Sequence, residues 1–130
     1  MNSIELPKQS KIAGLYARVS TARQEEQETI DSQLDEIKVR IASEGNTLPE
    51  SNLFQDDGWT GEMLERPGLD AMRDAASDGR FEVLYVYDRG RISRIFAYQE
   101  IIIEEIINKG IDFVTLHDIA ANTPEERVMQ

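Results

Sequence analysis

The chain has 130 residues, of which 40% are hydrophobic, and a formal net charge of −11 at pH 7. That length favours one domain with a proper core. Because no apolar run could span a bilayer and no signal peptide stands at the start, we expect a cytoplasmic protein without membrane contact. The absence of cysteine excludes disulfides, thiol catalysis and thiolate metal sites. The acidic balance argues against a broad nucleic-acid clamp and favours a small anion site built from local arginines.

The first predicted element is a strand over residues 12–17, which follows a flexible leader over residues 1–10. Residues two apart in an extended chain point to the same side, so Arg18 and Ser20 are expected to face one site. A helix should follow, because apolar residues recur at helical spacing and a glycine stands where the helix would end. These residues are Ile30, Leu34, Ile37, Ile41 and Gly45.

Strands and helices alternate along the rest of the chain. The expected strands are residues 53–54, 81–87 and 111–116, the expected helices are 67–79 and 95–108, and residues 55–65 form an exposed loop. This alternation predicts an α/β fold: a mainly parallel central sheet of four to five strands with helices on both faces. Thr123-Pro124-Glu125-Glu126 is typical of a helix start. Since the sequence stops about one turn later, we expect a fragment whose helix and further domains are missing.

The arginines indicate the chemistry of the site. Ligands of such sheets bind beyond the carboxyl ends of the strands, where Ser20 and two later segments, 56–61 and 89–94, are expected to meet. Arg91 and Arg94 are three apart at a helix start and should share a face. Guanidinium forks match phosphate oxygens, and several of them can stabilise a phosphoryl transition state without a metal. The alternative is that each arginine only pairs with a surface acid.

Other chemistries find less support. A Ser-His-Asp triad would need the sole histidine, His117, and the chain has no Gly-x-Ser-x-Gly elbow, so His117 is expected to be a strand-end residue. Asp56-Asp57 and His117-Asp118 lack a second ligand pair of matching spacing. Phosphate-binding glycine motifs are absent, and no cofactor is expected.

Six short stretches, in order, resemble the catalytic domain of the serine recombinases, the resolvase/invertase and large serine integrase family. The likeness runs from about Lys11 to the end and is greatest to the large integrases and transposon recombinases. The stretches are Tyr16-Ala-Arg18-Val-Ser20-Thr-Ala-Arg-Gln24, Ile30-Asp-Ser-Gln33, Asp57-Gly-Trp-Thr60-Gly61, Glu65-Arg66-Pro67-Gly68-Leu69, Arg91-Ile-Ser-Arg94 and Asn122-Thr-Pro-Glu.

The resemblance implies a mechanism and a partner. Ser20 would attack a DNA phosphodiester, form a phosphoserine bond to the 5′ end and free a 3′ hydroxyl, and reversal after strand exchange would reseal the DNA. The domain would act as a dimer that becomes a tetramer, with no metal and no cofactor. The residues implied to hold the scissile phosphate are Arg18, Arg66, Arg91 and Arg94, and Gln24 would order the site. Asp57 and Thr60 would contact the substrate, whereas Arg89 is either a further phosphate contact or a surface residue.

One position departs from the family pattern. Gly90 stands where the family block usually has an aspartate before its first arginine, although another register would use Asp88-Arg89. Two alternatives to a DNA recombinase of a mobile element therefore stay open. One is a decayed recombinase that keeps the fold for regulation or assembly, and the other is a small α/β module that binds a phosphorylated ligand.

Overall fold

The computed structural model describes residues 10–19, 30–58 and 66–117. Within them the chain alternates between strands and helices, as the sequence predicts. The elements are β1 (Ala13–Val19), α1 (Ile30–Ser43), the 3-10 turn η3 (Glu50–Asn52), β2 (Leu53–Asp57), α2 (Pro67–Ser77), β3 (Val83–Val86), α3 (Arg89–Ile92), α4 (Phe96–Asn108) and β4 (Asp112–Thr115). The predicted leader before Ser10 and the helix start at Thr123 lie outside the described residues.

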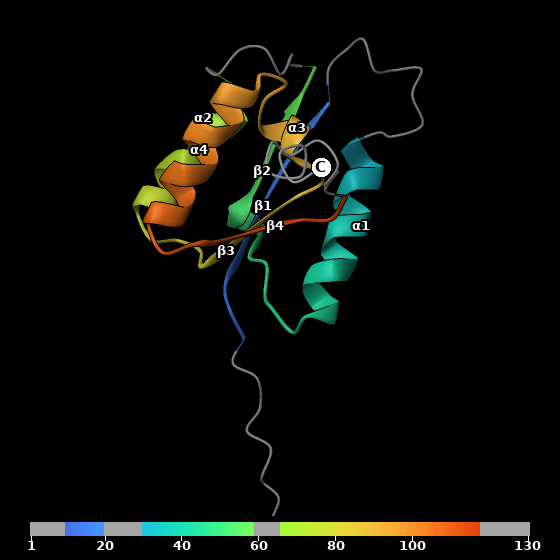
Figure 1. The fold of residues 1–130 in the computed structure, drawn as a ribbon. Helices are drawn as coiled ribbons and strands as arrows, with labels where there is room; N and C mark the ends of the chain where they lie inside the picture. Colours follow the sequence, from blue (N-terminus) through green and yellow to red (C-terminus); the bar gives the residue numbers. More distant parts are fainter. Residues whose placement is uncertain (1–9, 20–29, 59–65, 118–130) are drawn as a thin grey trace, which may run out of the picture.

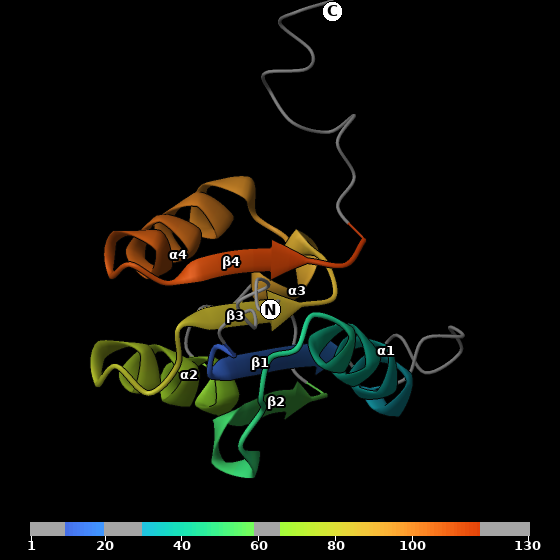
Figure 2. The same cartoon turned by 90° about the horizontal axis from the view of Figure 1, so that it is seen from below.

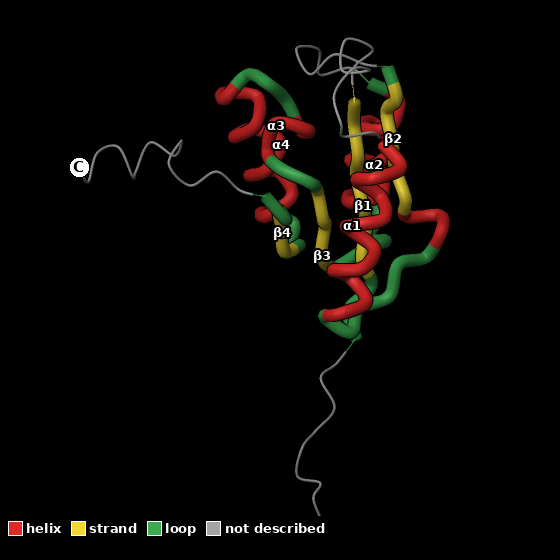
Figure 3. The backbone as a smooth tube through the Cα atoms, turned by 90° about the vertical axis from the view of Figure 1, so that its right-hand side faces the viewer, coloured by secondary structure: helices red, strands yellow, loops and turns green. Residues whose placement is uncertain are grey.

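The four strands form one parallel sheet in the order β2-β1-β3-β4 (Figure 3). Helices α2 and α4 cover one face and α1 covers the other (Figures 1 and 2). This confirms the predicted fold class. None of the helices within the described residues has the length and apolarity needed to cross a membrane.

The alternation of side chains along β1 divides the core into two clusters. Leu15 and Ala17 pack against α1, whereas Tyr16 joins the cluster beneath α2 and α4. The next residue on the side of Tyr16 is Arg18, so β1 carries this arginine to the face where α3 lies.

Three helices end where the sequence predicts. Gly45, Gly79 and Gly110 have φ values of 78°, 72° and 81°, the left-handed region that follows many helix ends. The expectation of an exposed loop from residue 55 is wrong in part, because β2 continues to Asp57 and pairs with the end of β1. The predicted loop is also not uniformly exposed, since Asp56 is only 2% exposed.

Asp56 connects the end of β2 to the start of α2. Its Oδ1 accepts a hydrogen bond from Gly68 N at 2.7 Å, and its Oδ2 accepts bonds from Leu69 N at 2.9 Å and from the Tyr16 hydroxyl at 2.6 Å. The carboxylate thus caps α2 from a neighbouring strand, because Arg66 at the N-cap makes no side-chain cap bond. A Cβ at Gly68 would lie 2.5 Å from Gln55 O, so the approach of this helix to the strand requires glycine.

We expect Asp56→Asn to destabilise the domain by roughly 2 kcal/mol, because in either amide orientation an N–H donor would face the backbone donors of α2. The midpoint of urea unfolding measures the loss. Asp57→Asn, at the exposed neighbouring position, is the control and should leave the midpoint unchanged. Equal midpoints for both variants would contradict the capping role.

A second link joins the two helices on that face. Arg73 of α2 donates from Nε to Glu105 Oε2 at 3.0 Å and from Nη2 to Oε1 at 2.7 Å. These hydrogen bonds lower the pKa of the Glu105 carboxyl below its ordinary value. The pair links α2 to α4 at their partly exposed surface, in addition to the apolar cluster that the two helices share.

The stabilisation from this ion pair should depend on pH. Because the folded-state pKa of Glu105 is lowered, the advantage of the wild type over Glu105→Gln should be full above about pH 4.3, the unfolded-state pKa of glutamate, and disappear at lower pH. The difference at pH 7 should be below about 1 kcal/mol, since the pair is partly exposed. Urea unfolding at pH 7, 5 and 3 measures it, and Glu104→Gln on the exposed side of α4 is the control. A gap as large at pH 3 as at pH 7 would refute the assignment.

Candidate active site

Three of the predicted arginines meet at α3, beyond the carboxyl ends of β1 and β3. Arg18 comes from the end of β1, Arg66 immediately precedes α2, and Arg91 belongs to α3 itself. Arg18 donates from Nε to the carbonyl oxygen of Arg91 at 3.0 Å and from Nη2 to that of Gly90 at 2.8 Å. The structure thus brings together side chains that lie more than 70 residues apart in the sequence.

Arg66 binds the same segment. Its Nη1 donates to the Tyr16 hydroxyl at 2.9 Å and to Arg91 O at 3.2 Å, and its Nη2 donates to Ile92 O. Two guanidinium groups therefore bind three successive carbonyl oxygens of α3. This is possible because a four-residue helix leaves most of its carbonyls without an intrahelical partner.

Both guanidinium groups are buried, with 1% of Arg18 and none of Arg66 exposed. Burial, followed by the positive charge of Arg66, lowers the pKa of Arg18 to about 10. Burial also lowers the pKa of Arg66, which Tyr16 and Asp56 partly offset. A concentration of positive charge in low-dielectric surroundings favours an anion that can accept several hydrogen bonds.

Tyr16 connects Arg66 to Asp56 through two hydrogen bonds of its hydroxyl group. Its hydroxyl accepts from Arg66 and donates to the Asp56 carboxylate, and burial raises the pKa of the phenol so that it keeps its proton. Sequence reasoning missed this role for both residues. The signal for Tyr16 was its position two residues before Arg18 on the same side of the strand, whereas Asp56 was considered only as a loop residue or metal ligand.

The end of β1 is held from two sides. Arg18 O accepts from Gln33 Nε2 at 3.3 Å and from Arg91 Nη1 at 3.5 Å. Gln33 is buried on α1, and its Oε1 has no hydrogen-bond partner in the described part of the chain. The carbonyl that these two side chains hold lies two residues before Ser20, so they position the backbone that leads to the predicted nucleophile.

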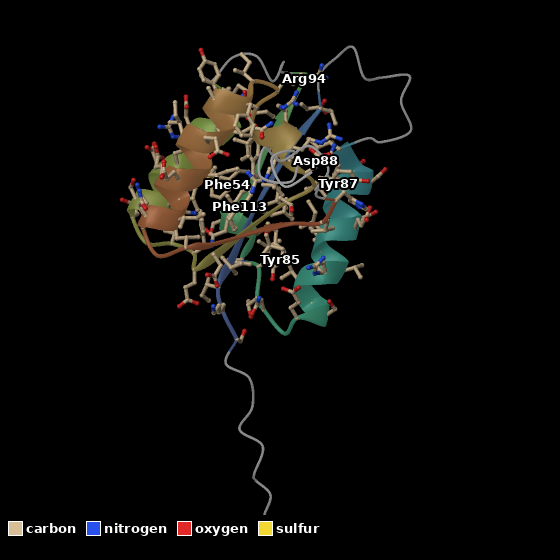
Figure 4. The ribbon with its side chains drawn as sticks, viewed as in Figure 1. Phe54, Tyr85, Tyr87, Asp88, Arg94 and Phe113 are labelled. Atoms are coloured by element: carbon tan, nitrogen blue, oxygen red, sulfur yellow. The ribbon has the colours of Figure 1, made fainter. Side chains whose placement is uncertain are left out.

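Arg91 is half-buried and makes two further contacts. Its guanidinium carbon lies 5.4 Å from the centroid of the Tyr87 ring, and its Nε lies 3.7 Å from Asp88 Oδ1. Figure 4 shows Tyr87, Asp88 and Arg94 around α3. The Tyr87 ring also contacts His117, at 4.5 Å between ring centroids, and His117 lies two residues after the end of β4, near the predicted strand end.

The other predicted residues are less closely associated with this cluster. The expectation that Arg91 and Arg94 share a helix face is wrong, because α3 ends at Ile92 and α4 begins at Phe96, with extended Ser93 between them. Arg94 is exposed. Arg89 forms an ion pair with α4, since its Nη1 lies 3.7 Å from Glu100 Oε2. Asp57 is exposed at the end of β2. Ser20, Gln24 and Thr60 lie outside the described residues.

The described residues contain no group of three or more histidine, cysteine, aspartate or glutamate side chains placed to hold a metal ion. What they do contain is a set of fixed hydrogen-bond donors. Arginine side chains from β1, from the start of α2 and from α3 meet at this short helix, where the donors of Arg18 and Arg66 are bound to backbone carbonyl oxygens. Guanidinium groups of this kind match the oxygens of a phosphate group once those donors are released.

Solved structures of similar fold are recombinase domains. The N-terminal catalytic domain of TP901-1 integrase superposes with a TM-score of 0.73 at 23% identity, over 92% of this chain and 88% of that one. The C-terminal catalytic domain of ISC1926 TnpA, an IS607-like serine recombinase, gives 0.71 at 21% identity over 91% and 75%. A serine recombinase from Sulfolobus solfataricus gives 0.64 at 20% identity over 93% and 76%. At these identities the likeness establishes the fold.

Sequence comparison establishes the family. A Bacillus subtilis (strain 168) protein named "Putative DNA recombinase" is 36% identical over 112 residues, which are 85% of this chain and 21% of that protein. The chain therefore spans about a fifth of the length of this relative. Residues 13–130 match the family model described as "Resolvase, N terminal domain". The chain belongs to the resolvase N-terminal domain family.

Proposed function

We propose that the chain is the catalytic domain of a site-specific DNA recombinase that cleaves and rejoins DNA in the cytoplasm through Ser20. The observation that carries the proposal is the convergence of Arg18, Arg66 and Arg91 at the end of the strand that leads to Ser20. Membership of the resolvase family supports it. A broad basic surface is not needed for this chemistry, because one phosphate group is the target.

The proposed reaction is a balanced transesterification. Ser20 Oγ loses its proton, attacks the phosphorus and forms a phosphoserine ester, while the bond from phosphorus to the 3′ oxygen breaks. That oxygen takes up one proton, so that the serine proton lost and the proton gained by the 3′ hydroxyl balance. The reverse attack by a 3′ hydroxyl of an exchanged strand releases Ser20. Guanidinium groups stabilise the negative charge that develops on the phosphoryl oxygens, and Gln24 and Thr60 complete the site.

Arg18 and Arg66 can contact a phosphate only if their donors leave the carbonyl oxygens that they bind now and bind phosphate oxygens in their place. In the structure their donors bind the carbonyl oxygens of α3 and both side chains are buried. A displacement of α3 from the end of β1 would free these donors together. We propose that DNA binding and assembly of the complete protein bring about this exchange.

We also propose that residues 11–130 are one catalytic domain and that the complete recombinase continues into a long oligomerisation helix. It would act as a dimer that becomes a tetramer, with further DNA-binding segments that compensate for the acidic charge of this domain. The shorter span of this chain relative to the Bacillus protein supports the proposal. One observation favours a second candidate, a decayed recombinase with a regulatory or assembly role, namely Gly90 in place of the usual aspartate.

Ser20→Ala should abolish a covalent complex with DNA without changing the fold. The complete recombinase is incubated with plasmids that carry the DNA flanking its own coding sequence, and adducts are separated on denaturing gels. The wild type and the control Ser77→Ala, which alters an exposed serine of α2, should both form the adduct. Survival of the adduct in Ser20→Ala would disprove the nucleophile assignment, and its absence from the wild type would favour the decayed recombinase.

Arg94→Ala should reduce DNA cleavage by about 100-fold while leaving the melting temperature unchanged, because the side chain is exposed and serves the phosphate alone. Rates of strand cleavage and thermal unfolding of the same preparation measure the two effects. Lys38→Ala, which removes one exposed cation from α1, is the charge-matched control. A cleavage rate equal to that of the control would remove Arg94 from the site.

A further inference from the structure

The carboxylate of Asp88 lies beside the backbone of Gly90. A Cβ built at Gly90 would be 3.2 Å from Asp88 Oδ1, closer than most real contacts of this kind. Gly90 is not among the glycines with positive φ, so its backbone conformation is open to other residues. The carboxylate of Asp88 thus occupies part of the space that a side chain at position 90 would fill.

The conformation of Asp88 directs its carboxylate toward Arg91. Asp88 is the N-cap of α3 with an extended backbone, φ −156° and ψ 171°, yet its side chain makes no capping hydrogen bond. Its Oδ1 lies 3.7 Å from Arg91 Nε, and the two side chains are only 27% and 15% exposed. The pair is therefore better shielded from solvent than an ordinary surface ion pair.

Arg91 depends on this contact for its orientation. Its Nε is buried and has no hydrogen-bond partner within the described residues, so the Asp88 carboxylate compensates that end of the guanidinium. The opposite end donates from Nη1 to Arg18 O, and Tyr87 supports the group from one side. These contacts hold the Arg91 guanidinium beside the carbonyl of Arg18, at the end of the strand that leads to Ser20.

We propose that Asp88 is a positioning residue for Arg91 and supplies, from two residues earlier in the chain, the carboxylate that Gly90 lacks. The inference rests on the proposed recombinase function. It explains the absence of the family's usual aspartate at position 90 by a carboxylate that has moved to position 88, and not by a loss of activity. Asp88 contacts Arg91 and not the DNA, so its effect on cleavage should pass entirely through that arginine.

A swap of the carboxylate tests the proposal in the complete recombinase. Asp88→Ala and Asp88→Asn should each slow cleavage at least about tenfold, because misplacing a catalytic group by about 1 Å can cost roughly 100-fold. Gly90→Asp alone should also be slow, since its side chain would crowd Asp88. The double variant Asp88→Ala/Gly90→Asp should cleave faster than Asp88→Ala. On a logarithmic scale it should recover at least half of the difference in cleavage rate between Asp88→Ala and the wild type. Asp78→Asn, an exposed aspartate at the end of α2, should cleave like the wild type.

Two further measurements separate positioning from a structural role. In an Arg91→Lys background, Asp88→Asn should cause no additional loss of rate, whereas a general loss of fold would reduce it again. In the complete protein labelled with ¹⁵N-arginine, the Arg91 Nε–H resonance should shift in Asp88→Asn and stay near its wild-type position in Asp88→Glu.

The outcomes distinguish this inference from the proposed function. If the wild type forms no DNA adduct, the recombinase function fails, and the arginine resonance alone decides whether Asp88 holds Arg91. If the wild type cleaves DNA, then a full rate for Asp88→Asn, or a double variant no faster than Asp88→Ala, overturns the positioning role. An unchanged resonance in Asp88→Asn overturns it in either case.

Discussion

The site depends on two buried guanidinium groups bound to the carbonyl oxygens of one short helix. Burial of a cation is costly unless its donors are satisfied, and here the backbone of α3 accepts from both Arg18 and Arg66. Tyr16 and Asp56 complete the arrangement, since the carboxylate that receives the Tyr16 proton also caps α2. The start of α2, the end of β1 and the position of α3 are therefore one connected unit.

This arrangement is compatible with the proposed action of an acidic chain on DNA. With a net charge of −11 the domain cannot attract a polyanion over its whole surface, but the arginine cluster is local, and Arg18 and Arg66 are buried in it. Its low-dielectric surroundings strengthen the attraction for a phosphate group once that group has arrived. Affinity for the duplex would then come from other parts of the complete protein, whereas this domain would supply chemistry.

Much of the fold follows from local sequence signals. The alternation of apolar runs predicts the parallel sheet, and the glycines at positions 45, 79 and 110 mark helix ends through their left-handed backbone. The extension of β2 to Asp57 was not predictable, because a polar segment becomes a strand here through pairing with β1 and through the bonds of Asp56.

Contacts with distant segments also limit what could be predicted of the site. The placement of Arg18 at a strand end was readable, but Arg66 stands at the N-cap of α2 and not at a strand end. The burial of both side chains against α3 depends on partners from distant segments. The break between α3 and α4 separates Arg91 from Arg94 in a way that their spacing conceals.

The short helix α3 couples two requirements of the proposed reaction. Its carbonyl oxygens hold Arg18 and Arg66, and it carries both members of the pair between Asp88 and Arg91 at one end. A movement that releases the first two arginines would therefore also move the third, because a four-residue segment has too few internal bonds to absorb the displacement. Arg91 Nη1 also binds Arg18 O, so the same movement acts on the strand that leads to Ser20. Release of the phosphate-binding donors and alignment of the nucleophile would then be one event. In the proposed reaction this coupling would keep the site inactive until DNA supplied a better acceptor than the backbone.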